Sequence, residues 1–466
     1  MMKRFSVLFC LLFAQGWLCA QNTDSTQLRA IYNEVLSNGQ CHENLRVLCK
    51  EIGNRISGSE NAEKAVQWGK DLMDRSNFDR VYLQEVIVPK WVRGEKEELV
   101  IRGDKIELNS EILALGGSVG TNGSIEGKVI EVKSFKELEE LGKQTIEGKI
   151  VFYNRPMNPA LISTFHAYGG CVDQRHAGAS EAAKLGAIAT ITRSMTLRND
   201  NIPHTGSMSY KEGVPQIPAV AISSVGAFNL SKALKSDPEL IAGLTLSCRM
   251  EPDVVSHNVI GELKGSIYPE KVIVVGGHLD SWDVGEGAHD DGAGIVQSIE
   301  VLRIFNSIGI RPKHTLRCIL YMNEENGNRG GITYADMVKR EGEEHVMAFE
   351  SDRGGFTPRG FSVDGSLQQL QVIKAFEPLF EPYNIHIFKK GYSGVDIGPL
   401  RDGRICLVGL VPDSQRYFDF HHARTDTWEN VNKRELELGA ASVASLIFLV
   451  DKYGFEEIPK MNDFKD

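Results

Sequence analysis

Near-continuous apolar runs alternate with amphipathic segments in the C-terminal half of the chain. The apolar runs are KVIVVGGH, TLRCILYMNEEN, VMAFESD and RICLVGLV, and each is typical of a strand that is covered on both faces. Between them stand the helical patterns GAGIVQSIEVLRIFNSIG, GGITYADMVKREG and SLQQLQVIKAFEPLF. This alternation predicts an α/β fold built on a doubly wound, mostly parallel sheet.

The first 250 residues have two other patterns. Residues 26–76 hold three helical segments separated by turns, and Ser59 is a credible N-cap for the third. From about residue 95 the chain reads as short strands with one or two helices. We therefore predict a discontinuous arrangement, in which residues 21–94 and 251–466 form one α/β domain and residues 95–250 form a β-rich insert.

The N-terminus has the pattern of a secretory signal. A short basic start, MMKR, precedes the apolar stretch FSVLFCLLFAQGWLCA, which ends in small residues. This stretch is short for a permanent membrane anchor, and no later stretch is long enough to span a membrane. We expect residues 1–20 to be removed after Ala20 and the mature protein to be periplasmic or secreted, without a membrane anchor.

Charge and cysteine content exclude several classes of protein. The net charge is −10, and removal of Lys3 and Arg4 with the signal takes it to −12. An acidic chain without basic runs argues against binding to nucleic acid or to anionic membranes. The six cysteines after the signal form no disulfide framework, although Cys41 and Cys49 are spaced closely enough to pair. Cys318 and Cys406 lie in apolar runs and are expected in the core.

Four of the expected strands end in side chains that can bind a metal ion. These are His278 and Asp280 after the first strand, Glu324 and Glu325 after the second, Asp352 after the third, and His421 and His422 after the fourth. Asp290 and Asp291 precede the helix that follows the first strand. Any one of them could be a helix cap or a solvated charge, but ligands bind at the carboxyl ends of such sheets. Converging carboxylates repel one another unless a cation lies between them, so the pattern predicts a metal centre.

The number of candidate ligands indicates two metal ions. A single catalytic zinc uses three protein ligands and a water, whereas this chain offers at least five candidates. Mixed imidazole and carboxylate ligands without thiolate suit zinc, and cobalt or manganese would also accept them. Of the adjacent pair Glu324 and Glu325, one would bind metal and the other would serve as the general base.

At these residues the sequence resembles the co-catalytic di-zinc exopeptidases, and among them the carboxypeptidase Q-like group. The matching stretches are GHLDSWDVGEGAHDDGAG, NEENG, ESDRGGF, YSGVDIGPL and YFDFHHARTDTW. The resemblance extends through nearly the whole mature chain, and the middle region resembles a protease-associated domain. It implies two Zn²⁺ ions per chain, a peptide substrate and a homodimer.

The resemblance also implies a role for each candidate residue. The metal ligands would be His278, Asp290, Glu325, Asp352 and His422. Asp290 would bridge the two ions, Glu324 would be the general base, and Asp280 would orient the His278 imidazole. His422 is preferred to His421 because the ligand of this family stands four residues before an acid, here Asp426. Asp291 would shape the turn, and His289, which departs from the family pattern, is expected to be exposed or hydrogen-bonded rather than a stray ligand.

Three functions compete. The first is an exported exopeptidase that hydrolyses dipeptides or short peptides with a free N-terminus. The second is a glutaminyl cyclase-like acyl transfer, which uses the same fold with a single zinc and is disfavoured by the complete set of five ligands. The third is a non-catalytic, receptor-like binding module, which the intact Glu324 and Glu325 oppose. Residues 392–396 and 203–210 are expected either to line the substrate pocket or to form glycine-rich turns.

Overall fold

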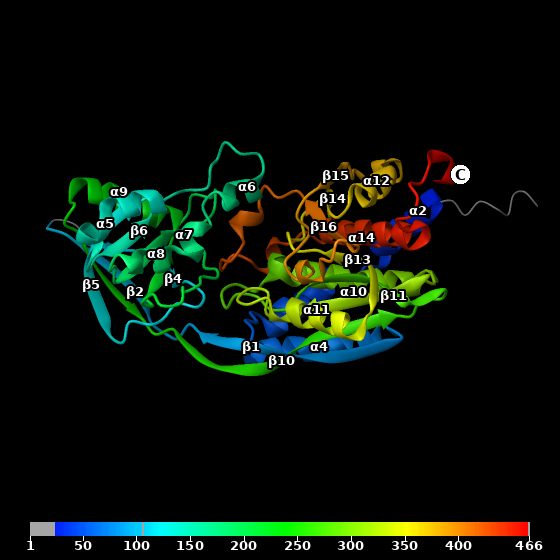
Figure 1. Cartoon of the computed structure of the whole chain (residues 1–466), viewed down its shortest axis with the longest axis horizontal. Helices are drawn as coiled ribbons and strands as arrows, with labels where there is room; N and C mark the ends of the chain where they lie inside the picture. Colours follow the sequence, from blue (N-terminus) through cyan, green and yellow to red (C-terminus); the bar gives the residue numbers. More distant parts are fainter. Residues whose placement is uncertain (1–23, 105–106, 465–466) are drawn as a thin grey trace, which may run out of the picture.

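The computed structural model describes residues 24–104 and 107–464, so the predicted signal peptide and its cleavage after Ala20 lie outside the described residues. The chain forms two eight-stranded sheets, which lie in two lobes joined along one side by a long two-stranded ribbon (Figure 1). The ribbon consists of β1 (Arg80–Val92) and β10 (Arg249–Leu263), paired antiparallel from Arg80 opposite Glu262 to Val92 opposite Arg249.

The first sheet carries the apolar runs that the sequence pattern marks as strands. Its order is β1, β10, β12 (His314–Tyr321), β11 (Tyr268–His278), β13 (Glu344–Glu350), β16 (Cys406–Pro412), β14 (Pro358–Asp364) and β15 (Ile387–Lys390). Four of its neighbouring pairs are parallel and three are antiparallel. The predicted α/β class with a mostly parallel sheet is confirmed. The short strands β14 and β15, at one edge, are additional to the four expected runs.

Helices cover both faces of this sheet. Ile273 and Val275 of β11 belong to a large core with helices on one face, and Val272 and Val274 pack with α11 (Arg329–Glu341) on the other. The helices of the large core are α2 (Asp24–Asn38), α3 (Cys41–Val47), α4 (Glu60–Arg75), α10 (Ala293–Ser307), α12 (Leu367–Ala375), α13 (Glu377–Phe380) and α14 (Lys433–Tyr453). This alternation of faces explains why the strands are apolar at every position. The Ser59 side chain accepts a hydrogen bond from the Ala62 N–H and caps α4, as predicted.

The second sheet comes entirely from residues 97–246. Its order is β3 (Glu107–Asn109), β2 (Glu97–Arg102), β9 (Ile241–Leu246), β5 (Ser124–Val132), β6 (Ile150–Tyr153), β7 (Ala189–Arg193), β8 (Ala219–Ile222) and β4 (Ile112–Ala114). It is accompanied by α5 (Phe135–Ile146), α6 (Thr164–Gly169), α7 (Asp173–His176), α8 (Gly178–Lys184) and α9 (Ser224–Ser236). The expectation of one or two helices in this region was wrong, because the N-caps Ser134 and Ser223 start helices that the strand-rich pattern conceals. The domain boundaries themselves stay a prediction.

Aromatic side chains join the second lobe to the first. The ring of Phe165 lies 5.2 Å from that of Tyr417, and the ring of Tyr168 lies 4.8 Å from that of Phe418. Such rings bury a large apolar area, so this contact fixes α6 against the chain segment that follows β16. The lobe containing the second sheet is therefore packed against one end of the first sheet.

The six cysteines of the described residues are all free and buried. Cys41 and Cys49 do not pair, and Cys318 and Cys406 are fully buried core residues, as expected from their apolar runs. Within residues 24–104 and 107–464, no helix has both the length and the apolar character that crossing a membrane requires.

Candidate metal centre

Five side chains from different elements of the first sheet meet at one edge. His278 is the last residue of β11, Glu325 follows β12, and Asp352 follows β13. Asp290 stands in the turn before α10, and His422 lies in the loop after β16. Because the central strands are parallel, their carboxyl ends lie together, and this brings residues far apart in sequence within a few ångströms of one another.

The carboxylate of Asp290 is the centre of the cluster. Its Oδ1 lies 3.3 Å from Nε2 of His278, which is also 3.7 Å from Oδ1 of Asp352. Its Oδ2 lies 3.3 Å from Nε2 of His422, which is 3.2 Å from Oε2 of Glu325. The two oxygens of Asp290 thus face two separate groups of ligand atoms, one on each side.

The ligand atoms fit a pair of divalent cations. His278 Nε2, Asp290 Oδ2 and Glu325 Oε1 are buried and accept or donate no hydrogen bond within the described part of the chain. The three residues are only 1–5% exposed. Unpaired buried polar atoms are costly, and carboxylates and imidazoles pointed at one another are the donors that zinc prefers. The cluster is therefore suited to hold metal on both sides of Asp290.

The charges of the cluster perturb its titration. Burial opposes ionisation of Asp290, but the imidazoles of His278 and His422 outweigh it and hold the pKa of Asp290 well below its ordinary value. Burial lowers the pKa of His422, and the carboxylates of Glu325 and Asp290 reverse this and raise that pKa to about 9. Burial, with the charge of Asp290, raises the pKa of Glu325 to about 7. Buried groups with pKa values shifted this far are typical of functional sites.

Glu324 differs from its neighbour Glu325. Its side chain is half-buried, and its carboxylate accepts no hydrogen bond from the described residues. Burial, reinforced by the charges of Asp352 and Glu325, raises its pKa well above the ordinary value, although His278 acts in the opposite sense. A carboxylate beside the ligands but free of fixed partners can exchange a proton with a bound molecule.

The expected role of Asp280 needs correction. The His278 imidazole makes its 3.0 Å Nδ1 contact with the main-chain carbonyl of Asp280, whereas the carboxylate lies 3.8 Å away. The carboxylate accepts hydrogen bonds from the backbone N–H groups of Asn323, Glu324 and Glu325 instead, at 2.7, 3.0 and 3.3 Å. These three donors occupy the carboxylate, so Asp280 fixes the loop that carries the two glutamates and orients His278 through its carbonyl.

The neighbours of Asp290 shape its turn. Asp291 accepts hydrogen bonds from the N–H groups of His278 and Gly294 at 3.1 and 3.0 Å, in agreement with its expected turn role. Asp426 accepts from the N–H groups of His289 and Asp290 at 2.7 and 3.1 Å. The sequence analysis missed this anchoring of Asp290, because it used Asp426 only to choose between His421 and His422.

His289 is buried and hydrogen-bonded. Its Nδ1 accepts from the Gly355 N–H, its Nε2 lies 3.2 Å from the Asn430 carbonyl, and its ring stacks on Phe356 at 4.1 Å. Burial lowers its pKa to about 4, so the ring is neutral near pH 7. The expectation of a hydrogen-bonded histidine rather than a stray ligand agrees with this geometry.

His421 lies beside His422 in the same loop. Its ring stacks on that of His422 with centroids 3.5 Å apart, and its Nε2 is 3.9 Å from Oδ2 of Asp290. His422 approaches the same oxygen to 3.3 Å and also contacts Glu325. The shorter contact and the second carboxylate favour His422 as the ligand.

The two segments expected near the substrate adjoin the cluster. His204, in segment 203–210, places its Nδ1 2.7 Å from the carbonyl of His421. In segment 392–396, the Val395 N–H donates to buried Glu350, two residues before Asp352. Their contribution to substrate binding stays a prediction.

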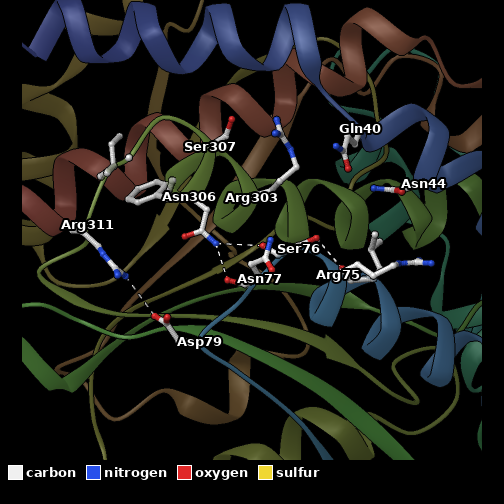
Figure 2. A pocket seen from close by; sticks show the side chains of 14 residues that line it. Gln40, Asn44, Arg75, Ser76, Asn77, Asp79, Arg303, Asn306, Ser307 and Arg311 are labelled. Carbon is white, nitrogen blue, oxygen red and sulfur yellow. Dashed lines mark hydrogen bonds and ion pairs between the residues drawn. The ribbon is translucent and has the colours of Figure 1, made fainter.

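A polar pocket of about 800 Å³ lies elsewhere, between α4 and the C-terminal end of α10 (Figure 2). Arg303 within it is paired with Glu34 and Glu300, and Arg311 lies 3.7 Å from Asp79. None of the predicted site residues lines this pocket, and these arginine charges are matched by acids of the chain itself.

Known proteins resemble both the sequence and the fold. Residues 258–447 match Peptidase family M28. The carboxypeptidase Q of Xenopus laevis is 38% identical over 387 residues, covering 83% of this chain and 80% of the relative. The human carboxypeptidase Q is 35% identical over 90% of this chain and 87% of its own length. The chain belongs to peptidase family M28.

Solved structures agree with this membership. A peptidase M28 precursor from Shewanella amazonensis SB2B superposes with a TM-score of 0.88 at 30% identity, covering 94% of this chain and 99% of that one. A zinc aminopeptidase from Bacillus subtilis shares the fold, with a TM-score of 0.64 at 19% identity over 90% of this chain and 98% of its own. As a member of family M28 the protein is a zinc-dependent exopeptidase, a hydrolase.

Proposed function

We propose that this M28 peptidase is an exported di-zinc enzyme that releases residues from dipeptides or short peptides with a free N-terminus. The observation that carries the two-metal part is the position of Asp290, whose two oxygens each lie 3.3 Å from a different histidine. A carboxylate in that position is suited to bridge two cations.

The ligands divide into two sets in this proposal. His278 and Asp352 would hold one zinc, Glu325 and His422 would hold the other, and Asp290 would contribute to both. When bound, two zinc ions polarise the scissile carbonyl and lower the pKa of a water molecule. The same ligand types also accept cobalt and manganese.

Glu324 moves the proton in the proposed reaction. Its carboxylate takes a proton from the attacking water and passes it to the nitrogen of the leaving amine, so it is regenerated in each cycle. The Asp280 carboxylate keeps the backbone of Glu324 in place through the hydrogen bond from its N–H. Glu324 and Asp280 thus act as base and positioning residue, respectively.

The proposal is tested with a panel of unblocked dipeptides and their N-acetylated counterparts, each with and without a chelator. We expect cleavage of the unblocked series and loss of cleavage on chelation. Cleavage of both series at equal rates would contradict the requirement for a free N-terminus. Cleavage that a strong chelator leaves unchanged would contradict the metal mechanism.

The two alternative functions give different readouts. A cyclase would convert a peptide that begins with glutamine into a product lighter by one ammonia, whereas a peptidase releases an amino acid, and mass spectrometry separates these products. A binding module without catalytic metal would hold less than about one zinc per chain after gentle purification.

Export and assembly are tested on the purified protein. If the signal is removed as proposed, the mature chain begins at Gln21, which N-terminal sequencing of the exported protein reads directly. The homodimer implied by the family resemblance is tested by light scattering after size-exclusion chromatography. A mature chain that retains Met1 would contradict the cleavage.

A further inference from the structure

We propose that the segment His204–Gly206 of the second lobe is a positioning element for His422, so that the metal site of Glu325 and His422 depends on this lobe. The inference rests on the proposed two-metal function. In this proposal the second lobe positions a metal ligand, in addition to any role that it has in binding substrate.

The segment and the histidine loop are joined by main-chain contacts. The N–H of Thr205 donates to the carbonyl of His422 at 3.0 Å, and Nδ1 of His422 lies 3.4 Å from the carbonyl of Thr205. The side chain of His204 adds a third contact, at 2.7 Å, to the carbonyl of His421. Residues more than 200 positions apart thus contact each other through the main chain of the histidine loop and through one ring nitrogen of His422.

These contacts determine which nitrogen of His422 faces the metal site. Nδ1 of the ring faces the second lobe, where the Thr205 carbonyl and the Arg175 guanidinium each lie 3.4 Å away, and Nε2 faces Asp290 and Glu325. A carbonyl that accepts from the far nitrogen of a metal-binding imidazole is a typical means of fixing its tautomer and orientation. Here that carbonyl belongs to the second lobe.

The backbone of His422 needs external support. Its φ is +60°, in the left-handed region that residues with a side chain adopt infrequently. Such a conformation persists where surrounding contacts hold it, and the hydrogen bond from Thr205 to the His422 carbonyl is one of them.

His204 is built as a hydrogen-bond donor to this loop. It is 3% exposed, and burial lowers its pKa to about 4, so the ring is neutral near pH 7. Its Nε2 is buried and has no hydrogen-bond partner in the described part of the chain, and so the proton is on Nδ1, which donates to His421. The single N–H of the neutral His204 ring therefore donates to the loop of His421 and His422.

Gly206 leaves room for this arrangement. Its φ is +133°, and a Cβ built there would lie 2.6 Å from Nδ1 of His422 and would also overlap the guanidinium of Arg175. Arg175 donates to the Ser207 carbonyl at 3.3 Å and to the Tyr168 hydroxyl at 2.7 Å, which holds the segment in place from the side of the second lobe. A side chain at position 206 would therefore force the Arg175 guanidinium and the His422 imidazole apart from the segment.

The first test compares Gly206→Ala with Gly123→Ala, a change in the same lobe at a glycine that also has a positive φ, +117°, but where a Cβ meets nothing within 4 Å. Metal-free protein is titrated with Zn²⁺ by calorimetry in the presence of a competing chelator. We expect two zinc ions in wild type and in Gly123→Ala. We expect Gly206→Ala to keep one site and to bind the other about 10- to 100-fold more weakly.

The second test changes only the His204 donor. His204→Phe keeps an aromatic ring and removes the donor, whereas His204→Asn offers an amide N–H near the position of Nδ1. We expect the same selective loss of zinc affinity in His204→Phe and its rescue in His204→Asn. Thermal unfolding of the metal-free variants serves as the folding control.

Two results would overturn the inference. One is wild-type affinity for both zinc ions in Gly206→Ala and His204→Phe. The other is equal weakening of both sites with a lower unfolding temperature, because that would show general destabilisation instead of a displaced ligand. Fewer than two zinc ions bound to the wild type would overturn the proposed two-metal function itself. The wild type is titrated separately from the variants, so this outcome is distinguished from a failure of the inference.

Discussion

Asp290, Glu324 and Glu325 are three carboxylates within one cluster that differ in their surroundings. Asp290 has an imidazole on each side, and Glu325 faces His422 at 3.2 Å. Glu324 has no such fixed partner among the described residues and is half-buried. If the proposed roles hold, the surroundings of these carboxylates, more than their residue type, distinguish the two metal ligands from the general base.

Replacement of Glu324 by glutamine tests this separation. The amide keeps the shape of the side chain but cannot accept the proton of the attacking water, so we expect turnover to fall on the order of 10²–10⁴-fold. Zinc content should stay at the wild-type value. Loss of zinc in parallel with activity would mean that Glu324 is a ligand.

Glu437 is a buried acid outside the metal cluster. It lies on α14, is 2% exposed, and its Oε2 has no hydrogen-bond partner in the part of the chain that is described. Burial, followed by the charge of Glu300, raises its pKa from 4.5 to about 7. The folded chain therefore binds this proton more tightly than the unfolded chain does.

This shift predicts a pH-dependent effect of Glu437→Gln. Below about pH 4.5, Glu437 is protonated in both the folded and the unfolded chain, so its burial costs no stability. As the pH rises towards 7 and above, the unfolded chain releases this proton more readily, and the free energy of unfolding falls. Glutamine mimics the protonated form, so the variant should match wild type at pH 4.5 and exceed it above pH 7, by up to about 3 kcal/mol. Urea unfolding across this range measures the difference. The exposed Glu139→Gln serves as control and should show no such trend.

At the scale of elements, the loop between β11 and α10 determines where Asp290 stands. Arg55, which is fully buried, donates to the carbonyls of Leu279, Glu286 and Gly287 at 2.6, 2.7 and 2.9 Å. One side chain from the N-terminal segment thus satisfies three main-chain groups of a loop more than 200 residues later. Without it, these carbonyls would lose their charged donor inside the protein.

Arg55→Met is therefore expected to destabilise the fold and to disturb the site. Three carbonyls lose charge-assisted bonds, and we expect a decrease of at least about 3 kcal/mol in the free energy of unfolding. Urea titration measures this value, and zinc content reports on Asp290. Arg46→Met, which removes the solvent-exposed pairs with Glu43 and Glu51, should lower the free energy of unfolding far less. Equal effects of the two substitutions would contradict the role given to Arg55.

At the scale of the whole molecule, the metal cluster lies where the two lobes meet. The proposed ligands stand at or after the ends of four strands of the first sheet and in the turn before α10, and the second lobe contacts the loop of His421 and His422. The cluster therefore joins parts of the chain that have separate cores. Binding of metal should stabilise the folded chain as a unit.

Removal of metal tests this coupling. A ligand that binds only the native state adds about 2.7 kcal/mol at a free concentration of 100 times its Kd. We expect EDTA to lower the thermal unfolding temperature and stoichiometric Zn²⁺ to restore it, whereas Mg²⁺ should not, because imidazole is a poor ligand for it. An unfolding temperature that is unchanged by EDTA would contradict metal binding in the native state.

The sequence by itself determined the α/β class, the four central strands and the edge at which the candidate ligands would meet. These features follow from local patterns, because apolar runs mark buried strands and parallel strands end at a common edge. The position of His278, Glu325 and Asp352 at or just after the ends of apolar runs is visible without coordinates.

Only the tertiary structure decided how these side chains are held. The carboxylate of Asp280 binds backbone amides of the glutamate loop, Asp426 anchors Asp290, and His204 reaches the histidine loop from another lobe. Each of these contacts joins segments more than 40 residues apart. Hydrogen bonds of this kind depend on how packed elements dock, and no periodicity along the chain encodes that docking.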